Sequence, residues 1–530
     1  MTAVGVEVRA DAPRTTDWWS VAGLSLAYLV THAVLIYQSL GPATTGANDV
    51  GLYAWWMGEG VRTGDWVGIE SPWVYPVGAL VPMLVASVFG VGSAYLGAWC
   101  GMVALINLGT AVVVIRRFGM TRAAGPLTGW FVFLMLLGPC GIARLDAVMM
   151  PLVLIALVVA AARPFLASVL LTCSAWIKVS GGLVLVPLFA VLRFAWERWS
   201  RVVAPAALTC LVVVLLQVVA GGRLSVLTSF VSAETERGLQ IEAVLATPVV
   251  LAHVARGEVP WVWNSELSTV ETWGPGADLA IRISDIAMPL MVVVVGLLAY
   301  LARRRPVPAL LVGALAMMSG LIVTHKVGSP QFVAWLAPPV VVALCVGKRW
   351  RFWLPVAGAV LVAAALTGLL YPWGYTQFLN ADRPMLAVWV IRNVLVAAVF
   401  VAALVELVRL WRSPGDGSAT IRGTDLGAAD RETSGDHAHD AAGPSPDLAP
   451  SPTTPVPGTH SDPGAAGREA EGDHAHDSAH SSSDTTSSPT PAVSGANQDP
   501  GGDQGPGASH DPAAGATSND AAADPARSCP

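Results

Sequence analysis

Apolar runs, most of them near twenty residues long, fill the chain from residue 18 to residue 412. A run of about 20 apolar residues crosses the hydrocarbon core of a bilayer as an α-helix, because a helix satisfies its own backbone hydrogen bonds there. The runs begin near Trp18, Ala94, Thr121, Asp146, Pro164, Gly182, Val202, Ile281, Val307, Gln331, Phe352 and Met385. The sequence therefore predicts an all-α polytopic membrane protein with about twelve transmembrane helices.

The remainder of the chain has a different composition. Residues 413–530 contain no Trp, Tyr or Phe, whereas residues 1–412 hold all 20 Trp. The 18 acids and 4 Arg of this tail give it a net charge of −14, while the body carries +8. A segment with so little apolar surface cannot offset the entropy lost on ordering. We therefore expect a membrane domain over 18–412 and a disordered, acidic Pro/Gly/Ala/Ser/His-rich tail over 413–530.

The tail also holds a short repeat, Asp436-His-Ala-His-Asp440, which recurs as Asp473-His-Ala-His-Asp477. His and Asp bind metals, but duplication of a low-complexity unit explains the pattern more simply. The six cysteines form neither a disulfide framework nor a zinc-ligand spacing. No glycine-rich phosphate loop is present. We expect no metal site, no cofactor and no nucleic-acid partner.

Basic residues in short loops predict the orientation, because positive loops stay cytoplasmic. The basic clusters are Arg116-Arg117 with Arg122; Arg193, Arg198 and Arg201; Arg303-Arg304-Arg305; Lys348-Arg349 with Arg351; and Arg409 with Arg412. All lie on one side if residues 1–17 and the tail are cytoplasmic and Tyr75–Phe89 forms an interfacial helix in the first outer loop. The uniform apolarity of Tyr75–Phe89 leaves a spanning helix open as the alternative. Segments 41–93 and 221–280 are then extracytoplasmic.

Asp49 is the first polar group of note. It lies in Gly46-Ala-Asn-Asp-Val-Gly-Leu-Tyr-Ala-Trp-Trp56, directly after the first apolar run. Aromatic rings prefer the boundary between water and lipid, which places this carboxylate at the outer membrane surface. One interpretation is a catalytic acid or base, and the other is a helix N-cap, which Asp forms readily.

Two further outer segments carry clustered charge. Thr324-His-Lys-Val-Gly-Ser-Pro-Gln-Phe-Val-Ala-Trp335 joins two apolar runs, and Glu234-Thr-Glu-Arg-Gly-Leu-Gln-Ile-Glu242 lies in the second long outer stretch. His325 titrates near neutral pH and Lys326 adds a cation at the interface. The alternatives are a turn with a snorkelling Lys and an ordinary amphipathic loop helix.

Several ionisable residues lie within or beside apolar runs. Lys178 interrupts one of them, and a Lys at a helix centre costs about 2.5–3.5 kcal/mol on insertion scales, so it needs a partner or a purpose. Arg144 and Asp146 are close enough in sequence to offset each other's charge. Arg392, with Asn393, interrupts the last run and can bind a carbonyl, a partner helix or a lipid phosphate.

The order of these motifs resembles a known family over roughly residues 18–412. The motifs are Asp49-Val-Gly-Leu-Tyr53, Tyr75-Pro76, Arg144-Leu-Asp-Ala-Val148, Trp176-Ile-Lys-Val179, Arg237-Gly-Leu-Gln-Ile-Glu242, His325-Lys-Val-Gly-Ser-Pro-Gln331 and Arg392-Asn393. In this order they are similar to the actinobacterial polyprenyl-phosphate-mannose-dependent mannosyltransferases of the GT-C superfamily, which include phosphatidylinositol mannoside mannosyltransferase. The chain departs from that family at Ser180-Gly181, where Trp-Pro is common, and at Val77, where a second Pro is common.

The resemblance implies an inverting sugar transfer from a lipid phosphate on the outer face, with Asp49 as the catalytic residue and His325 as a second active-site residue. Such a transfer needs a base for the acceptor hydroxyl and cations for the departing phosphate. The candidate substrate-binding residues are Tyr53, Tyr75, Lys178, Arg237, Gln240, Glu242, Lys326, Gln331 and Arg392.

The expected partners are a polyprenyl-phosphate sugar donor, a glycolipid or glycan acceptor, and membrane lipid. The expected location is the plasma membrane, with the active site on the extracytoplasmic face. A transporter or flippase is the alternative, and Lys178 and Asp285 would then line its path. The chain shows no evident internal duplication of the kind that many transporters have.

Overall fold

The computed structural model describes residues 18–41, 49–235, 237–264 and 269–413, which all belong to one compact unit. Within these residues, eight helical segments are long and apolar enough to cross a membrane. Their main helices are α1 (Trp18–Leu40), α4 (Ala94–Phe118), α5 (Met120–Leu137), α10 (Ala204–Val219), α14 (Pro275–Leu301), α15 (Pro306–Thr324), α17 (Trp350–Gly368) and α19 (Arg383–Arg412). The tail expected from residue 413 onward lies almost wholly outside the described residues.

Four of the twelve predicted runs form shorter apolar helices than the other eight. They are α6 (Asp146–Val159), α7 (Pro164–Ile177), η5 with α8 (Val179–Val184 and Leu185–Val191), and η8 with α16 (Pro330–Leu336 and Ala337–Val346). Each of the twelve runs is therefore helical, and the prediction of an all-α polytopic membrane protein is confirmed. The four short helices fall below the roughly 20 residues that span a bilayer alone.

The centre of the bundle is formed by α6, α15 and α16. Nearly every side chain of α15 is buried, and α6 is apolar on all sides with almost no exposed residue. A helix that is hydrophobic all round belongs in the interior. By contrast, α1, α10 and α14 expose many large apolar side chains, as expected of helices that face lipid tails. Membrane-facing helices thus surround a buried inner set.

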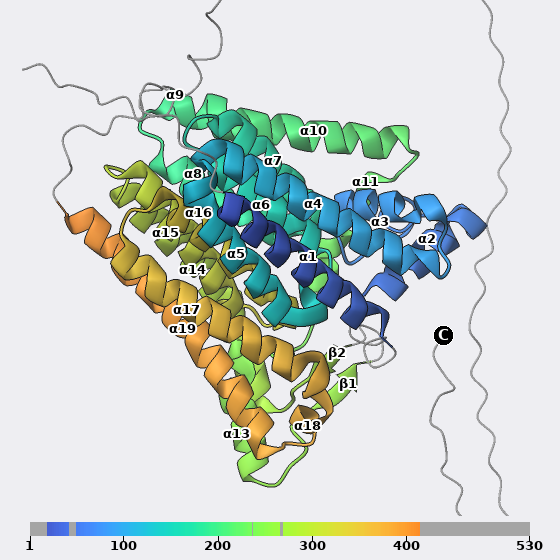
Figure 1. Ribbon diagram of the computed structural model, residues 1–530. Coiled ribbons are helices and arrows are strands. Elements are labelled where there is room, and N and C mark those ends of the chain that lie inside the picture. Colours follow the sequence, from blue (N-terminus) through green and yellow to red (C-terminus); the bar gives the residue numbers. More distant parts are fainter. Residues whose placement is uncertain (1–17, 42–48, 236, 265–268, 414–530) are drawn as a thin grey trace, which may run out of the picture. The chain divides into compact units, whose positions relative to one another are not determined.

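Short elements cluster at one end of the bundle. Figure 1 shows α13, α18 and the two strands there, while α9 lies at the opposite end. These short elements are α2 (Val50–Thr63), η2 (Val77–Ala79), α3 (Leu80–Ala86), η3 (Ser87–Phe89), α11 (Leu224–Leu227), α12 (Ser229–Thr235), η7 (Val244–Ala246), α13 (Thr247–Ala255), β1 (Val262–Asn264), β2 (Thr269–Glu271), η9 (Leu369–Trp373) and α18 (Tyr375–Leu379). The remaining connections are η4 (Gly138–Gly141), α9 (Ala195–Arg198) and η6 (Trp199–Val203).

An apolar helical segment and a two-stranded sheet at this end can be compared with the predictions from sequence. The apolar segment expected to lie at the interface is helical over Val77–Phe89, which is shorter than a membrane span. The antiparallel hairpin of β1 and β2, with Trp263 opposite Val270, was not indicated by the sequence pattern. Its strands of three residues are too short to show a clear alternation of apolar and polar side chains.

The opposite end of the bundle collects basic residues. Arg349, just before α17, forms an ion pair with Glu406 near the end of α19, and Arg409 lies 3.7 Å from the same carboxylate. Glu406 is buried, so these cations neutralise a charge that would otherwise be costly.

The predicted orientation can be checked by cysteine labelling in intact cells. We expect Glu70→Cys and Arg304→Cys, both at exposed positions, to react with impermeant reagents from opposite sides of the membrane. Lys348→Cys is the matched control, because it should react from the same side as Arg304→Cys. Labelling of Glu70→Cys and Arg304→Cys from the same side would overturn the orientation.

Candidate functional site

Asp49 occupies the N-cap position of α2, but its side chain makes no hydrogen bond to the backbone of that helix. Its carboxylate forms an ion pair with the Arg144 guanidinium, and the Tyr53 hydroxyl lies 3.4 Å from Asp49 Oδ2 as a hydrogen-bond donor. The Asp49 side chain is 26% exposed, whereas that of Arg144 is 9% exposed. Asp49 is therefore held from the protein side and stays accessible, and its side chain does not act as a cap.

A tight turn after α5 brings Arg144 to Asp49. Gly138 begins η4 with a φ of 69°, a left-handed conformation that glycine adopts without strain. A Cβ on Gly141 would lie 2.9 Å from a backbone carbonyl oxygen of α5, so the turn can close only around a glycine. This turn directs the following residues back across the end of the bundle.

Asp146 has a different set of partners from Arg144. Lys178 Nζ donates to Asp146 Oδ2 over 2.8 Å, and Trp335 Nε1 donates to Oδ1 over 2.5 Å. The ammonium also lies 4.6 Å from the centre of the Phe332 ring, a cation–π contact. Arg144 and Asp146 therefore do not neutralise each other, and the partner of the intramembrane Lys178 is Asp146.

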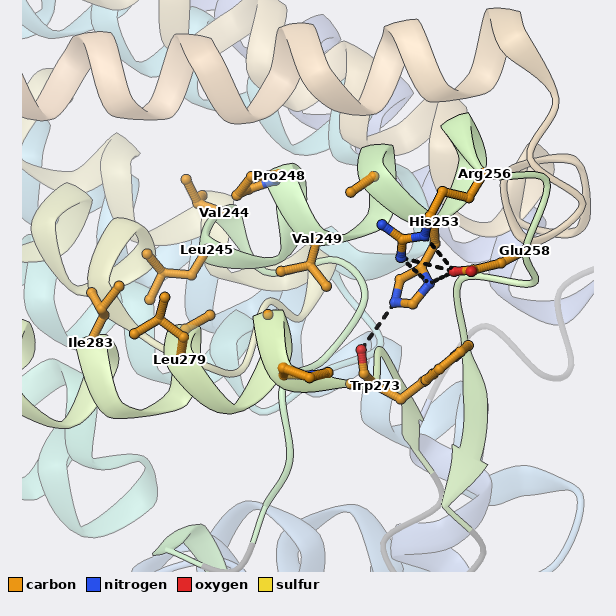
Figure 2. A pocket seen from close by; sticks show the side chains of 15 residues that line it. Val244, Leu245, Pro248, Val249, His253, Arg256, Glu258, Trp273, Leu279 and Ile283 are labelled. Atoms are coloured by element: carbon orange, nitrogen blue, oxygen red, sulfur yellow. Dashed lines mark hydrogen bonds and ion pairs between the residues drawn. The ribbon is translucent and has the colours of Figure 1, made fainter.

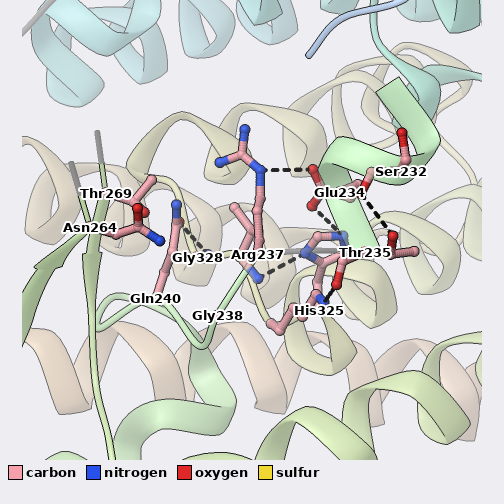
Figure 3. A network of polar contacts seen from close by, with 12 residues as sticks. Ser232, Glu234, Thr235, Arg237, Gly238, Gln240, Asn264, Thr269, His325 and Gly328 are labelled. Atoms are coloured by element: carbon pink, nitrogen blue, oxygen red, sulfur yellow. Dashed lines mark hydrogen bonds and ion pairs between the residues drawn. The ribbon is translucent and has the colours of Figure 1, made fainter. Parts of the chain in front are cut away.

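A second cluster surrounds Glu234, at the end of α12 (Figure 3). Arg237 Nε lies 3.1 Å from Glu234 Oε2, and His325 Nε2 lies 3.5 Å from Oε1 of the same carboxylate. Lys326 Nζ donates to the Thr235 carbonyl oxygen over 2.8 Å. Both outer segments singled out in the sequence thus meet, and they bring three basic side chains to one place.

The imidazole of His325 has a defined tautomer. Its Nδ1 accepts a hydrogen bond from the Val327 backbone N–H over 2.9 Å, so in the neutral ring the proton resides on Nε2, which faces Glu234. Burial lowers the pKa of His325 below its ordinary value, and the nearby Glu234 carboxylate opposes that shift. The neutral ring is therefore the form favoured at pH 7.

Close backbone packing holds the His325 turn against the strand-like segment before η7. A Cβ on Gly328 would lie 2.1 Å from the Ala243 backbone nitrogen, so only glycine permits this approach. Gln240 Oε1 accepts from the Gly328 N–H over 3.1 Å, and the Gln240 N–H donates to the Lys326 carbonyl over 3.0 Å. Gln240 is thus a bridge between the two outer segments.

Aromatic residues connect the two clusters. The Phe332 ring contacts Lys178 on one side and lies 6.3 Å from the His325 ring. Along another route, Arg144 Nη2 donates to the Tyr371 hydroxyl over 3.2 Å, and the Tyr371 and Tyr375 rings meet edge to face at 5.1 Å. The first route joins the Lys178–Asp146 pair to the Glu234 cluster, and the second leads from Arg144 toward Glu242. Because the Tyr75 phenol lies within electrostatic reach of Asp49, Arg144 and Arg237, we treat these clusters as one polar region.

Glu242 lies at the end of that second route. The Tyr375 hydroxyl donates to Glu242 Oε1 over 2.5 Å, and Arg392 Nη1 donates to the Glu242 carbonyl oxygen over 3.1 Å. Burial raises the pKa of Glu242, while the hydrogen bond from Tyr375 opposes that rise. Of the three roles considered for Arg392, carbonyl binding is the one that its contacts show; the side chain is 1% exposed.

The remaining candidates line the same region. Tyr75 packs edge to face on Trp73 and Trp56, at ring-centre distances of 5.4 and 6.1 Å, and burial raises the pKa of its phenol. The Tyr53 hydroxyl accepts from the Leu145 N–H over 3.3 Å. Gln331 is 6% exposed, and its Oε1 has no hydrogen-bond partner among the described residues. A buried amide oxygen without a partner is a natural contact for a substrate hydroxyl.

The sequence pattern indicated no role for Tyr371, Tyr375 or Glu234. Tyr371 and Tyr375 lie in Tyr371-Pro-Trp-Gly-Tyr375, a turn between two apolar runs, and that aromatic spacing was the available signal. Within the described ranges, His, Cys, Asp and Glu form no group of three or more that could hold a metal ion.

Comparisons with known proteins identify no family. No protein-family model matches the chain, and a search of curated proteins finds no match. Among solved structures, the chain is similar to ArnT from Cupriavidus metallidurans bound to undecaprenyl phosphate. The likeness covers 75% of this chain and 78% of that one, with 18% sequence identity and a TM-score of 0.38. A likeness this distant leaves the function to be inferred from the chemistry of the site.

The Lys178–Asp146 pair gives a prediction about stability. Lys178→Met should leave the Asp146 carboxylate, 1% exposed, without its cation, and breaking a buried pair in this way costs about 3–5 kcal/mol. Thermal unfolding of the purified protein in detergent should show a marked fall in melting temperature. The double variant Lys178→Met with Asp146→Asn should recover part of the loss, because no charge is then left buried. A single variant as stable as the parent would contradict this account.

His325 gives a prediction about pH. Because burial holds its pKa below the ordinary 6.5, the unfolded chain binds a proton more readily than the folded protein as pH falls through 6.5. The contribution to stability is therefore present above pH 6.5 and declines toward the lower pKa of the folded state. Between pH 7.5 and pH 5.5, the melting temperature of the parent should fall further than that of His325→Gln. Equal falls would show that His325 does not titrate as described.

Proposed function

We propose that this protein is a membrane glycosyltransferase that moves a mannosyl or related residue from a polyprenyl-phosphate sugar to a glycolipid or glycan acceptor of the cell envelope. The observation that carries the proposal is the accessible Asp49 carboxylate, held by Arg144 in a region that also gathers Lys178, Arg237 and Lys326. One acid and several cations at one end of a membrane bundle match the needs of sugar transfer from a lipid phosphate.

The Asp49 carboxylate is the general base for the acceptor hydroxyl in this proposal. In our proposal the acceptor hydroxyl oxygen attacks the anomeric carbon of the donor sugar, the bond from that carbon to the phosphate oxygen breaks, and Asp49 takes the hydroxyl proton. The electron pair of the broken bond leaves with the polyprenyl phosphate. A single displacement of this kind inverts the anomeric configuration. Arg144 is a positioning residue here, because it fixes the carboxylate that accepts the proton.

The cations act on the leaving phosphate. Lys326 and Arg237 lie on outer segments that meet at Glu234, and charge-assisted hydrogen bonds to phosphate are stronger than those to a neutral carbonyl. Lys326 now donates to the Thr235 carbonyl, so a bound phosphate offers it a better acceptor. His325 is neutral at pH 7 and carries its proton on Nε2, which faces Glu234. In our proposal this N–H donates a further hydrogen bond to the phosphate.

The transporter alternative receives less support. It required Lys178 and Asp285 to line one path, but Lys178 is paired with Asp146 on a buried central helix, whereas Asp285 is exposed on the outer surface of α14. We therefore favour an enzyme over a transporter. The basic loops support our proposal that it lies in the plasma membrane with its active site on the extracytoplasmic side.

Asp49→Asn tests the proposal. A general base contributes typically about 10²–10⁴-fold to rate, so the purified variant should lose sugar transfer from radiolabelled polyprenyl-phosphate mannose by about that factor. Asn caps a helix about as well as Asp, so a role confined to the start of α2 predicts near-normal turnover instead.

Asp65→Asn is the matched control. Asp65 lies in the same loop, is exposed, and accepts the Ser71 hydroxyl over 2.6 Å, so its loss should leave transfer nearly unchanged. Both variants are compared at equal amounts of folded protein and below the melting temperature of each, because Asp49→Asn also removes the ion pair with Arg144. Near-normal turnover by Asp49→Asn would reject Asp49 as the base and move the role to His325 or Glu242.

A further inference from the structure

A groove separate from the polar region lies between α13 and the first turns of α14. Its volume is about 700 Å³, within the 300–1,000 Å³ or so of sites that hold small-molecule ligands. Apolar side chains supply most of its lining, chiefly Val244, Leu245, Val249, Leu279 and Ile283. In Figure 2 four of these residues lie at one end, Val249 lies between, and His253, Arg256 and Glu258 lie at the other end. The groove is therefore amphipathic along its length.

The polar end is a connected network. His253 is buried, with Nδ1 2.6 Å from Glu258 Oε2 and Nε2 3.0 Å from the Trp273 carbonyl oxygen. Arg256 donates to Glu258 Oε2 through Nε over 3.0 Å and Nη2 over 2.8 Å. The Arg256 side chain is 54% exposed, and its Nη1 makes no hydrogen bond within the described part of the chain. One edge of a fixed guanidinium is thus presented at the rim.

The apolar end continues into the surface of a membrane-spanning helix. Leu279 and Ile283 lie one turn apart on α14 and are both exposed. Beyond the exposed Arg282 and Asp285 of the same helix, Ile286, Leu290 and Val293 continue the exposed apolar surface. Exposed apolar side chains on a helix that crosses the bilayer lie against lipid chains. The groove therefore runs from a polar end near the start of α14 toward the hydrocarbon region.

We propose that this groove binds one acyl chain of a bilayer phospholipid, with the phosphate of that lipid at Arg256. The polar and apolar ends of the groove follow the order of headgroup and acyl chain in a leaflet. The exposed edge of the Arg256 guanidinium can donate a hydrogen bond to a phosphate oxygen. The site is independent of sugar transfer.

The direction of the groove distinguishes a phospholipid from the lipid donor. Its apolar end begins at Val244, two residues after Glu242, so the apolar end is the one near the proposed reaction site. A donor whose phosphate meets Lys326 and Arg237 would enter the groove with its charged group at the apolar end. A phospholipid with its phosphate at Arg256 would instead have its charged group at the polar end of the groove and its acyl chain at the apolar end.

Photo-crosslinking of the full-length protein in nanodiscs tests the proposal. The probe is a phosphatidylcholine with a diazirine at the middle of one acyl chain, and labelled peptides are mapped by mass spectrometry. We expect strong labelling of residues 244–258 and 275–283, relative to the lipid-facing surface of α10, and loss of that excess when unlabelled phosphatidylcholine competes. Equal labelling of both surfaces would mean ordinary contact with surrounding lipid and would overturn the proposal.

Two pairs of measurements sharpen the test. Ala252→Trp fills the groove from an exposed lining position and should reduce labelling several-fold, whereas Ala255→Trp, exposed on the same helix outside the lining, should not. Arg256→Gln should weaken labelling by the phosphatidylcholine probe but not by a diacylglycerol probe that lacks phosphate. Unchanged labelling of Ala252→Trp, or displacement by polyprenyl phosphate and not by phosphatidylcholine, would reject the phospholipid. Neither outcome depends on whether the protein transfers sugar.

Discussion

The buried carboxylate of Asp146 constrains the whole functional end of the bundle. At 1% exposure it has almost no contact with water, and an unpaired charge in that position would cost several kcal/mol. Lys178 and Trp335 satisfy it, so the end of α7, the start of α6 and η8 must meet at one point. Once they meet, Arg144 is carried to Asp49 and Phe332 is placed between Lys178 and His325.

The sequence predicted the helices better than the contacts among them. Apolar runs are a local property, and each of the twelve runs is helical, including the buried ones that are too short to span alone. Arg144 and Asp146 looked like mutual partners because they are near in sequence. Side chains two residues apart on or beside a helix point in different directions, however. Arg144 and Asp146 therefore contact residues of different elements. The pairing of Arg144 with Asp49 and of Asp146 with Lys178 depends on how the helices pack, which the local sequence does not show.

The candidate cations differ in how easily a phosphate could replace their present hydrogen-bond partners. Lys326 donates to a neutral carbonyl oxygen, and a charged phosphate oxygen is a stronger hydrogen-bond acceptor than that. Arg237, by contrast, is already paired with the Glu234 carboxylate. Arg392 is fully buried and fixed on the Glu242 carbonyl and on Asn393. In the proposed reaction Lys326 is therefore the cation best placed to follow the leaving phosphate, while the contacts of Arg392 hold the segment that carries Glu242. Side-chain type alone, which is all that sequence offers, does not separate these roles.

Residues 240–258 contribute to both the polar region and the groove within a short length of chain. Gln240 and Glu242 belong to the polar region, and the groove begins at Val244 and ends at the network around His253. The last helix fixes the junction, because Arg392 binds the Glu242 carbonyl and Asn393 Nδ2 donates to the Thr247 hydroxyl over 2.9 Å. A lipid that stabilises α13 would therefore stabilise the segment that carries Glu242. Arg392 and Asn393 therefore tie the groove and the polar region to the same helix.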